Sequence, residues 1–349
     1  MKTILILSLF ILSACTMSNE QKIDDLLKNY QGQVPGASLI IIKEGKILLK
    51  KGYGLANLEH KSPVESNSTF RLASVTKQFT AMCIMILEEQ GKLSYDTKLT
   101  DIFPDFPEYG NQITIENILR HTSGLIDYES LLPDTMQGQV LDKDVLQLMK
   151  EQDSTYFEPG LKYQYSNTGY AVLAMIIEKL SGISFADFLK QNIFGPLAMD
   201  NSVAFVKGVS EVPHRSYGYA VSDSGFVFRD QSSTSAVLGD GGIYTNVEDM
   251  FKWDQALYTD KLVSFSSLER AWTPGNPPET PDNTYGYGWR IDTYKGHKRI
   301  HHNGSTCGFR NCIQRFPDDK LTLVLLTNRD EPDVFPIVES ISDLFLEQK

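Results

Sequence analysis

The chain has 349 residues, of which 41% are hydrophobic and 22% charged, which supplies a sizeable core and excludes intrinsic disorder and a fibrous repeat. Its length suggests one large domain or about two smaller ones. Lys and Arg number 33 against 44 Asp and Glu, a net charge of −11 without a basic stripe, so we expect no nucleic-acid partner. Four cysteines are too few for a disulfide scaffold.

The first residues predict an export signal. One positive charge, Lys2, precedes an apolar run from Ile4 to Leu12 and then small residues. This order is typical of a secretory signal peptide, here residues 1–14, and the run is too short to span a bilayer. The alternative is a buried N-terminal strand or helix, although so apolar a stretch rarely begins a soluble domain.

Residues 12–15, Leu-Ser-Ala-Cys, resemble the processing box of bacterial lipoproteins. The resemblance implies cleavage before Cys15 and acylation of this cysteine, and two or three acyl chains hold a protein to a membrane where one is marginal. Thr16 follows this cysteine. The resemblance associates an Asp at this position with retention in the inner membrane, and Thr16 is not an Asp. We therefore expect an exported, membrane-anchored lipoprotein, on the periplasmic face of the outer membrane if the source is Gram-negative.

The other cysteines would then fold in an oxidising compartment. Cys83 lies in a long apolar stretch and is predicted to be an inert core thiol. Cys307 and Cys312 either form a bridge across a turn or stay reduced on neighbouring strands, because the sequence does not determine their distance.

The mature chain opens with a predicted amphipathic helix at residues 20–31, where apolar residues recur at helical spacing. Ala37–Ile42 and Lys46–Tyr53 are rich in Ile and Leu and predict a β-hairpin. Val75–Gln90 is apolar and helix-forming, with Gly91 as a plausible C-cap.

The middle of the chain, roughly residues 92–240, predicts helices separated by Pro, Gly and Asp, two of them at Ile115–Arg120 and Tyr170–Leu180. The end predicts strands and then a terminal helix at Phe335–Leu346. These strands are Lys298–His302, Phe309–Phe316 and Leu321–Thr327, the last two joined by a turn at residues 317–319.

These elements predict an α+β protein whose antiparallel β-sheet, built from both chain ends, is flanked by the terminal helices. Residues 15–85 and 285–349 would form this sheet lobe, and residues 86–284 a second, mainly helical lobe. A cleft between the lobes is the natural place for a site.

The strongest local motif is Ser74-x-x-Lys77, at the start of the apolar helix. Residues three apart share a helix face, and a serine hydroxyl needs a neighbouring base to act as a nucleophile. An ammonium in a partly buried cleft loses its proton more easily, so Lys77 either accepts the Ser74 proton or holds a charged network around it. Alone the motif is weak and also occurs on surface helix turns, but the apolar run after it favours a buried helix.

A second motif, Tyr165-Ser-Asn167, precedes a helix. In an extended loop these two side chains point the same way, and so face one cleft. A nearby Lys makes a tyrosine a usable general base, and Asn167 offers a donor and an acceptor to a substrate amide or to Lys77. The alternative for this motif is a Tyr-rich structural turn.

A third motif, His302-Asn-Gly304-Ser305, stands at the end of a predicted strand. Gly304 permits close approach of a substrate to the backbone, and His302 is a titratable donor. An edge strand there would offer an N–H to an oxyanion, together with the N–H of Ser74.

The ordered series Ser-x-x-Lys, Tyr-x-Asn and His-x-Gly resembles the superfamily of serine β-lactamases and penicillin-binding proteins. The likeness runs from Val34 to Asn328 and is greatest to the branch with class C β-lactamases, DD-peptidases, D-aminopeptidases and related esterases. It includes His121–Leu125, Gly239–Gly242 and Tyr285–Trp289, which resemble accessory segments of this branch.

The resemblance implies a β-lactamase/DD-peptidase-like fold with no cofactor and no metal. Ser74 would be the acylated nucleophile, Lys77 and Tyr165 would share proton transfer, and Asn167 would orient the substrate. The N–H groups of Ser74 and Ser305 would form the oxyanion hole.

The third motif departs from the Lys-Thr-Gly of typical β-lactamases of this kind. Lysine stays cationic at neutral pH, whereas His302 would be mostly neutral, so recognition of a substrate carboxylate should be weaker or pH-dependent. The His form resembles peptidase, aminopeptidase and esterase members instead.

Other sites are disfavoured. His301 and His302 point to opposite faces of a strand and cannot bind one metal, and His297 adds only a weak cluster. His121 is expected to be a cap or a buried turn residue. The chain has no Gly-x-Ser-x-Gly elbow and no P-loop or dinucleotide fingerprint.

We therefore expect a lipid-anchored serine hydrolase that cleaves an amide or ester, with a D-amino-acid peptide as the leading substrate. A carboxylesterase or a β-lactamase on the same fold, or a penicillin-binding sensor without turnover, are the alternatives. Its partners would be a small peptide, ester or β-lactam, and a membrane through Cys15. The sequence does not identify the base for deacylation.

Overall fold

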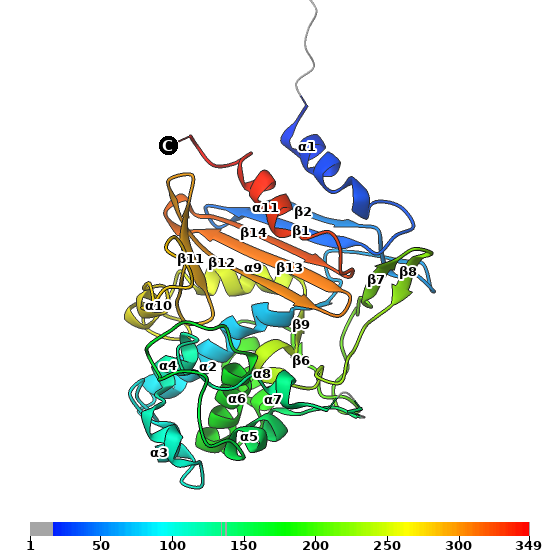
Figure 1. The fold of residues 1–349 in the computed structure, drawn as a ribbon. Coiled ribbons are helices and arrows are strands. Elements are labelled where there is room, and N and C mark those ends of the chain that lie inside the picture. The colour runs from blue at the N-terminus through cyan, green and yellow to red at the C-terminus, as the bar shows by residue number, and fades with distance from the viewer. Residues whose placement is uncertain (1–16, 134, 137, 349) are drawn as a thin grey trace, which may run out of the picture.

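A seven-stranded antiparallel sheet with strand order β10-β11-β12-β13-β14-β1-β2 brings the two ends of the chain together (Figure 1). The computed structural model describes residues 17–133, 135, 136 and 138–348, so the predicted signal peptide and Cys15 lie outside the described residues. The strands of this sheet are β1 (Ala37–Lys43), β2 (Lys46–Tyr53), β10 (Thr284–Tyr285), β11 (Arg290–Tyr294), β12 (His297–Thr306), β13 (Phe309–Phe316) and β14 (Leu321–Thr327). The predicted α+β class and the sheet built from both chain ends are confirmed.

Helices cover both faces of this sheet (Figure 1). The terminal helices α1 (Asn19–Leu26) and α11 (Phe335–Ser342) lie on one face, and α9 (Val247–Ala256) packs against β1 and β14 on the other. Beyond it lie α2 (Lys77–Glu89), α3 (Leu99–Ile102), α4 (Ile115–Leu119), α5 (Asp142–Lys150), α6 (Asn167–Ser181), α7 (Phe185–Leu189), α8 (Leu238–Gly241) and α10 (Phe265–Ala271). The boundaries of the two predicted lobes stay a prediction.

Short elements connect these layers. The 3₁₀ turns are η1 (Lys28–Tyr30), η2 (Ala73–Thr76), η3 (Glu108–Gln112), η4 (Tyr128–Leu131) and η6 (Pro317–Asp319), and η5 (Lys190–Phe194) is a π-helical turn. The minor strands are β3 (Leu55–Asn57), β4 (Ser62–Pro63), β5 (Phe70–Arg71), β6 (Val203–Ala204), β7 (Tyr219–Ser222), β8 (Gly225–Phe228) and β9 (Ile243–Thr245). No helix among the described residues is long and apolar enough to cross a membrane.

The two faces of the sheet follow the two-residue period of a strand. Along β1, Leu39 and Ile41 pack in the cluster with the terminal helices, whereas Ile40 and Ile42 pack in the larger cluster with the helical layer. Alternate side chains of β1 therefore pack on opposite faces of the sheet. A shift of the strand by one residue would reverse these faces, so the packing fixes the register.

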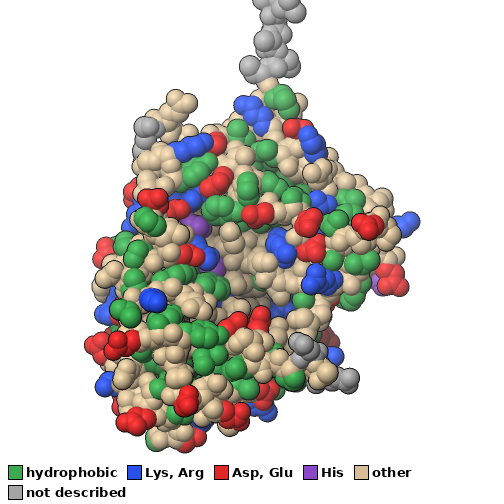
Figure 2. All heavy atoms as spheres, in the orientation of Figure 1, with side chains coloured by type: hydrophobic (Ala, Val, Ile, Leu, Met, Phe, Trp, Pro, Cys, Tyr) green, Lys and Arg blue, Asp and Glu red, His purple; other side chains and the backbone are tan. Residues whose placement is uncertain are grey.

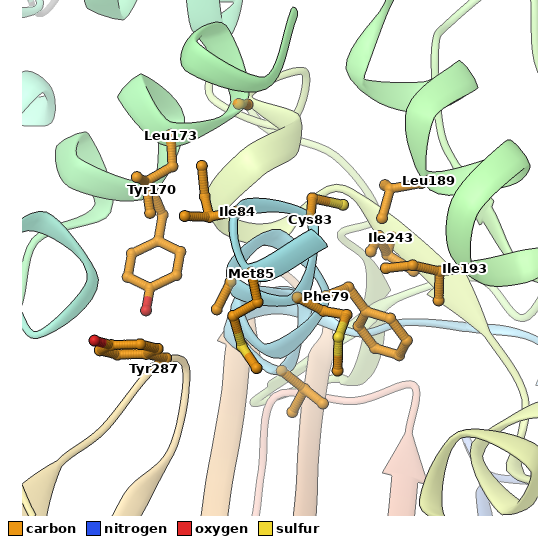
Figure 3. Packing of buried hydrophobic residues seen from close by; sticks show 14 of the residues in the cluster. Phe79, Cys83, Ile84, Met85, Tyr170, Leu173, Leu189, Ile193, Ile243 and Tyr287 are labelled. Atoms are coloured by element: carbon orange, nitrogen blue, oxygen red, sulfur yellow. The ribbon is translucent and has the colours of Figure 1, made fainter. Parts of the chain in front are cut away.

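Helix α2 is buried on every side, and this position determines where the active site can form. Figure 3 shows Ile84 beside Leu173 and Tyr170 of α6, and Phe79 beside Ile193. Cys83 is fully buried in this cluster, as predicted, and burial raises the pKa of its thiol.

Several predicted boundaries shift. The terminal helix predicted to reach Leu346 ends at Ser342, where the Asp343 carboxylate turns to accept hydrogen bonds from Lys295 and Tyr294. Strand β12 runs on to Thr306, beyond the predicted end. The first predicted helix is interrupted after Leu26 and continues as the turn η1.

The two late cysteines are free thiols in the structure. Cys312 is buried in β13 and Cys307 lies in the turn between β12 and β13. Of the two alternatives, the structure supports the reduced pair.

A buried ion pair between sheet and helix generates a stability prediction. Arg315 Nε lies 2.8 Å from Asp254 Oδ1, and their side chains are 0% and 1% exposed. Asp254→Ala should lower the free energy of unfolding by about 3–5 kcal/mol, because it leaves a buried charge without its partner. Urea unfolding followed by circular dichroism measures this loss, with Asp25→Ala, in the exposed pair with Lys28, as a control that should not shift the midpoint. An unchanged midpoint for Asp254→Ala would contradict the role of this pair.

Candidate active site

Three distant segments meet in a pocket between the sheet and the helical layer. The residues around it are Arg71, Ala73, Ser74, Tyr128, Glu129, Asn167, Thr234, Asp240, Gly241, Ser305 and Thr306. Figure 2 shows the face of the molecule hollowed between the sheet and the helices below it. Three residues from three separate predicted motifs, Ser74, Asn167 and Ser305, therefore line one pocket.

The side chain of Lys77 joins two of these motifs. Its ammonium is fully buried and lies 3.3 Å from Ser74 Oγ, 2.8 Å from Asn167 Oδ1 and 2.9 Å from the backbone oxygen of Asp240. An ammonium has three N–H donors, and each has an acceptor here. The nitrogen is thus held within hydrogen-bond distance of the serine hydroxyl, and in its neutral amine form it can accept the hydroxyl proton.

Ser74 lies in the turn η2 and not in the predicted α-helix, which begins at Lys77. The residue before it, Ala73, has a φ of +51°, in the left-handed region that costs a non-glycine residue about 1–3 kcal/mol. An α-helix cannot pass through this conformation, so helical backbone follows only after Ala73, first in the 3₁₀ turn η2 and from Lys77 as the α-helix. The strained turn places Ser74 on the wall of the pocket.

Tyr165 lies beside Lys77, whose Nζ is 4.9 Å from the centre of its ring. Two neighbours hold the ring: His121, with ring centres 4.3 Å apart, and Arg290, with its guanidinium carbon 5.3 Å from the ring centre. His121 is buried and its Nδ1 accepts the backbone N–H of Ser166, which confirms the predicted buried turn residue. The predicted set Ser74, Lys77, Tyr165 and Asn167 is thus brought together, although sequence gave no sign of the Arg290 contact.

His302 differs from its predicted role. It is fully buried, and its Nδ1 lies 2.7 Å from the backbone oxygen of Asn303. A carbonyl only accepts, so Nδ1 carries the hydrogen, and Nε2 accepts the hydroxyl hydrogen of Tyr285 at 2.8 Å. Burial, with the charges of Arg290 and Lys77, lowers the pKa of His302 well below its usual value. A neutral ring agrees with the prediction, but the predicted role as a titratable donor does not hold, because both ring nitrogens are already engaged in hydrogen bonds.

The sequence predicts that Gly304 lets a substrate approach the backbone, but the structure shows a neighbour from the chain itself. A Cβ at this position would lie 2.0 Å from the backbone oxygen of Leu72. The backbone that approaches Gly304 is therefore the chain's own, at the turn that carries Ser74, and not that of a substrate. Glycine is required here so that β12 can lie directly against this turn.

Ser305 lies in a part of β12 that pairs with a neighbouring strand on one side only. The pairing of β12 with β11 ends at His301, while its pairing with β13 continues to Thr306. The predicted edge strand is thus the second half of β12, and Ser305 is exposed there and lines the pocket.

The pocket also contains titratable residues that were not identified as site residues from the sequence, namely Arg71, Tyr128, Glu129 and Asp240. Asp240 lies in Gly239–Gly242, a segment that the sequence marked only by its resemblance. The Tyr128 hydroxyl lies 3.4 Å from Asp240 Oδ2, and burial raises the pKa of the Asp240 carboxyl to about 6. A buried acid beside a catalytic amine has no local sequence signal, because its burial depends on segments more than a hundred residues away.

Comparisons with known proteins agree with this geometry. The Beta-lactamase family model matches residues 19–344. "Penicillin-binding protein 4*" of Bacillus subtilis is 37% identical over 84% of this chain and 68% of its own length. The crystal structure of a penicillin-binding protein from Bacillus halodurans superposes with a TM-score of 0.82 at 28% identity, over 93% of this chain and 99% of that one. The crystal structure of D-amino acid amidase from Ochrobactrum anthropi is similar in fold, with a TM-score of 0.79 at 24% identity. The superposition covers 93% of this chain and 97% of that one.

The hydrogen bonds of His302 predict its behaviour in solution. Because the buried ring cannot be solvated as a cation, we expect His302 to stay neutral, with the hydrogen on Nδ1, from pH 8 down to about pH 5.5. Long-range ¹H–¹⁵N NMR of the histidine rings measures this state, and His302→Gln identifies the signal. A His302 signal that titrates with a midpoint between about 6 and 7 would contradict the assignment.

Proposed function

The chain belongs to the β-lactamase family of serine hydrolases, and we propose that it cleaves an amide or ester bond through an acyl-enzyme on Ser74. The single observation that carries this proposal is the buried Lys77 ammonium, in contact with Ser74 Oγ and fixed by Asn167 Oδ1. When Lys77 is a neutral amine, the pair supplies a nucleophile and its proton acceptor in one site, as covalent catalysis requires.

Acylation follows from these positions. Ser74 Oγ attacks the carbonyl carbon of the substrate while its proton passes to Lys77 or Tyr165, and the same groups return a proton to the leaving group. The N–H groups of Ser74 and Ser305 would stabilise the oxyanion, since both residues line one pocket. Asn167 would orient both the amine and the substrate amide.

The proposed natural substrate is a small peptide that contains a D-amino acid. Support comes from the names of the relatives, which are penicillin-binding proteins, and from the fold shared with a D-amino acid amidase. A carboxylesterase is the second candidate. The observation that favours it is the neutral, buried ring of His302, which leaves no cation at this position for a substrate carboxylate.

We also propose that the protein is exported and held to a membrane through acyl chains on Cys15. This proposal rests on the charged residue, apolar run and Leu-Ser-Ala-Cys box at residues 2–15. No contact or distance of the described residues bears on it.

The acyl-enzyme proposal is tested on soluble protein that starts after Cys15. We expect a fluorophosphonate probe to label the wild type, and nitrophenyl butyrate or a D-amino-acid nitroanilide to be turned over. Ser74→Ala should abolish labelling and lower turnover at least about 1,000-fold, because no other group replaces the nucleophile. Ser266→Ala, which changes an exposed serine of α10, is the matched control. Labelling that persists in Ser74→Ala would refute the proposal.

The anchor is tested on the full chain in a bacterial host. We expect radioactive palmitate to be incorporated, and Cys15→Ser to lose both the label and the membrane fraction, since the thiol is the acylation site. Cys307→Ser is the control and should keep the label. Equal labelling of the Cys15→Ser protein would disprove acylation at this cysteine.

A further inference from the structure

The pocket beside Ser74 contains buried charged groups that acylation does not use. Asp240 is 8% exposed and Arg71 is 3% exposed, and both line the pocket with Ser74. Arg71 donates through Nε to the backbone oxygen of Gly241 and through Nη2 to that of Ser235. Its Nη1 has no hydrogen-bond partner among the residues that the structure describes. An unpartnered buried donor in a pocket indicates a ligand that accepts a hydrogen bond there.

The size and lining of the pocket fit water. Its volume is about 70 Å³. That is ample room for a water molecule beside Ser74, and a buried water needs two to four polar partners. A water in this pocket can accept from Arg71 Nη1 and donate to a carboxylate, so donor and acceptor are both supplied.

A substrate ammonium group fits the same pocket less well. It carries only donors, so it would leave Arg71 Nη1 without an acceptor. It would also lie close to two cations, Arg71 and Lys77, whose charges both act on Asp240. The mixture of donors and acceptors therefore favours water over an amine.

We infer that Asp240 is the catalytic base for deacylation and activates a water held between its carboxylate and Arg71. The inference rests on the proposed acyl-enzyme on Ser74. In this step the water oxygen forms a bond to the acyl carbon and one of its protons passes to Asp240. Asp240 passes this proton to the neutral amine of Lys77, the bond from that carbon to Ser74 Oγ breaks, and Oγ takes the proton from Lys77. The acid leaves, and one water is consumed in each turnover.

The surroundings of Asp240 suit this role. Burial raises the pKa of its carboxyl to about 6, while the charges of Lys77 and Arg71 act in the opposite direction, so the carboxylate is available at neutral pH. Tyr128 is a weaker candidate, because burial raises the pKa of its hydroxyl far above its usual value. Glu129 also lines the pocket and is the more exposed of the two acids, although burial raises the pKa of its carboxyl as well.

The test uses nitrophenyl butyrate, which has no amine, with wild type, Asp240→Asn and, as a control outside the pocket, Asp25→Asn of α1, in the exposed pair with Lys28. A general base contributes about 10²–10⁴-fold, so we expect steady-state turnover by Asp240→Asn to fall at least about 100-fold. A burst of about one nitrophenolate per protein should remain, and mass spectrometry should find butyryl on Ser74. Hydroxylamine, a nucleophile that needs no base, should restore turnover. Asp25→Asn should stay within about threefold of the wild type.

Each result separates the two proposals. A wild type with no turnover and no Ser74 adduct refutes the acyl-enzyme itself. If the wild type turns over and Asp240→Asn matches it, the deacylation role is overturned, and an effect seen only on amine-bearing substrates would assign the pocket to an ammonium group. If Asp240→Asn loses both the burst and the steady-state turnover, the inference is also contradicted, because acylation would then depend on Asp240.

Discussion

The arrangement of the active site depends on one buried charge, the ammonium group of Lys77. A cation removed from water is tolerated only where its donors are satisfied, and the three acceptors here are Ser74 Oγ, Asn167 Oδ1 and the backbone oxygen of Asp240. They come from η2, from the start of α6 and from α8. The requirement to satisfy one ammonium therefore holds together three segments, the last of which supplies an acceptor 163 residues after Lys77.

The rest of the fold keeps these segments in register. Helix α2 carries Lys77 and is enclosed by apolar side chains from several other helices, so the amine cannot turn towards solvent. On the opposite side, Gly304 of β12 lies against the backbone of Leu72, which presses the sheet onto the turn that carries Ser74. The left-handed conformation of Ala73 persists because packing on both sides fixes it, as expected for strain at a functional turn.

Much of this could be predicted from the sequence, where local pattern and chemistry coincide. The hairpin β1–β2, the sheet from both chain ends and the buried α2 follow from periodicity and apolar runs, and Ser74, Lys77 and Asn167 from their spacing. The burial of His302 and its hydrogen bond with Tyr285 could not be predicted, since only the folded sheet places Tyr285 beside it. The same holds for Gly304, whose neighbour is Leu72, more than two hundred residues earlier, and for the pairing of Asp240 with Tyr128. Burial and long-range contact leave no mark on the local sequence.

The most direct test of the account is a crystal structure with an arylboronic acid, which mimics the tetrahedral species of acyl transfer. The account predicts a covalent bond from boron to Ser74 Oγ, with Lys77 Nζ still bound to Asn167 Oδ1. One boronate oxygen should lie about 2.7–3.1 Å from the backbone nitrogens of Ser74 and Ser305. An adduct on a different residue, or a boronate bound to Ser74 with its oxygens turned away from both nitrogens, would contradict the account.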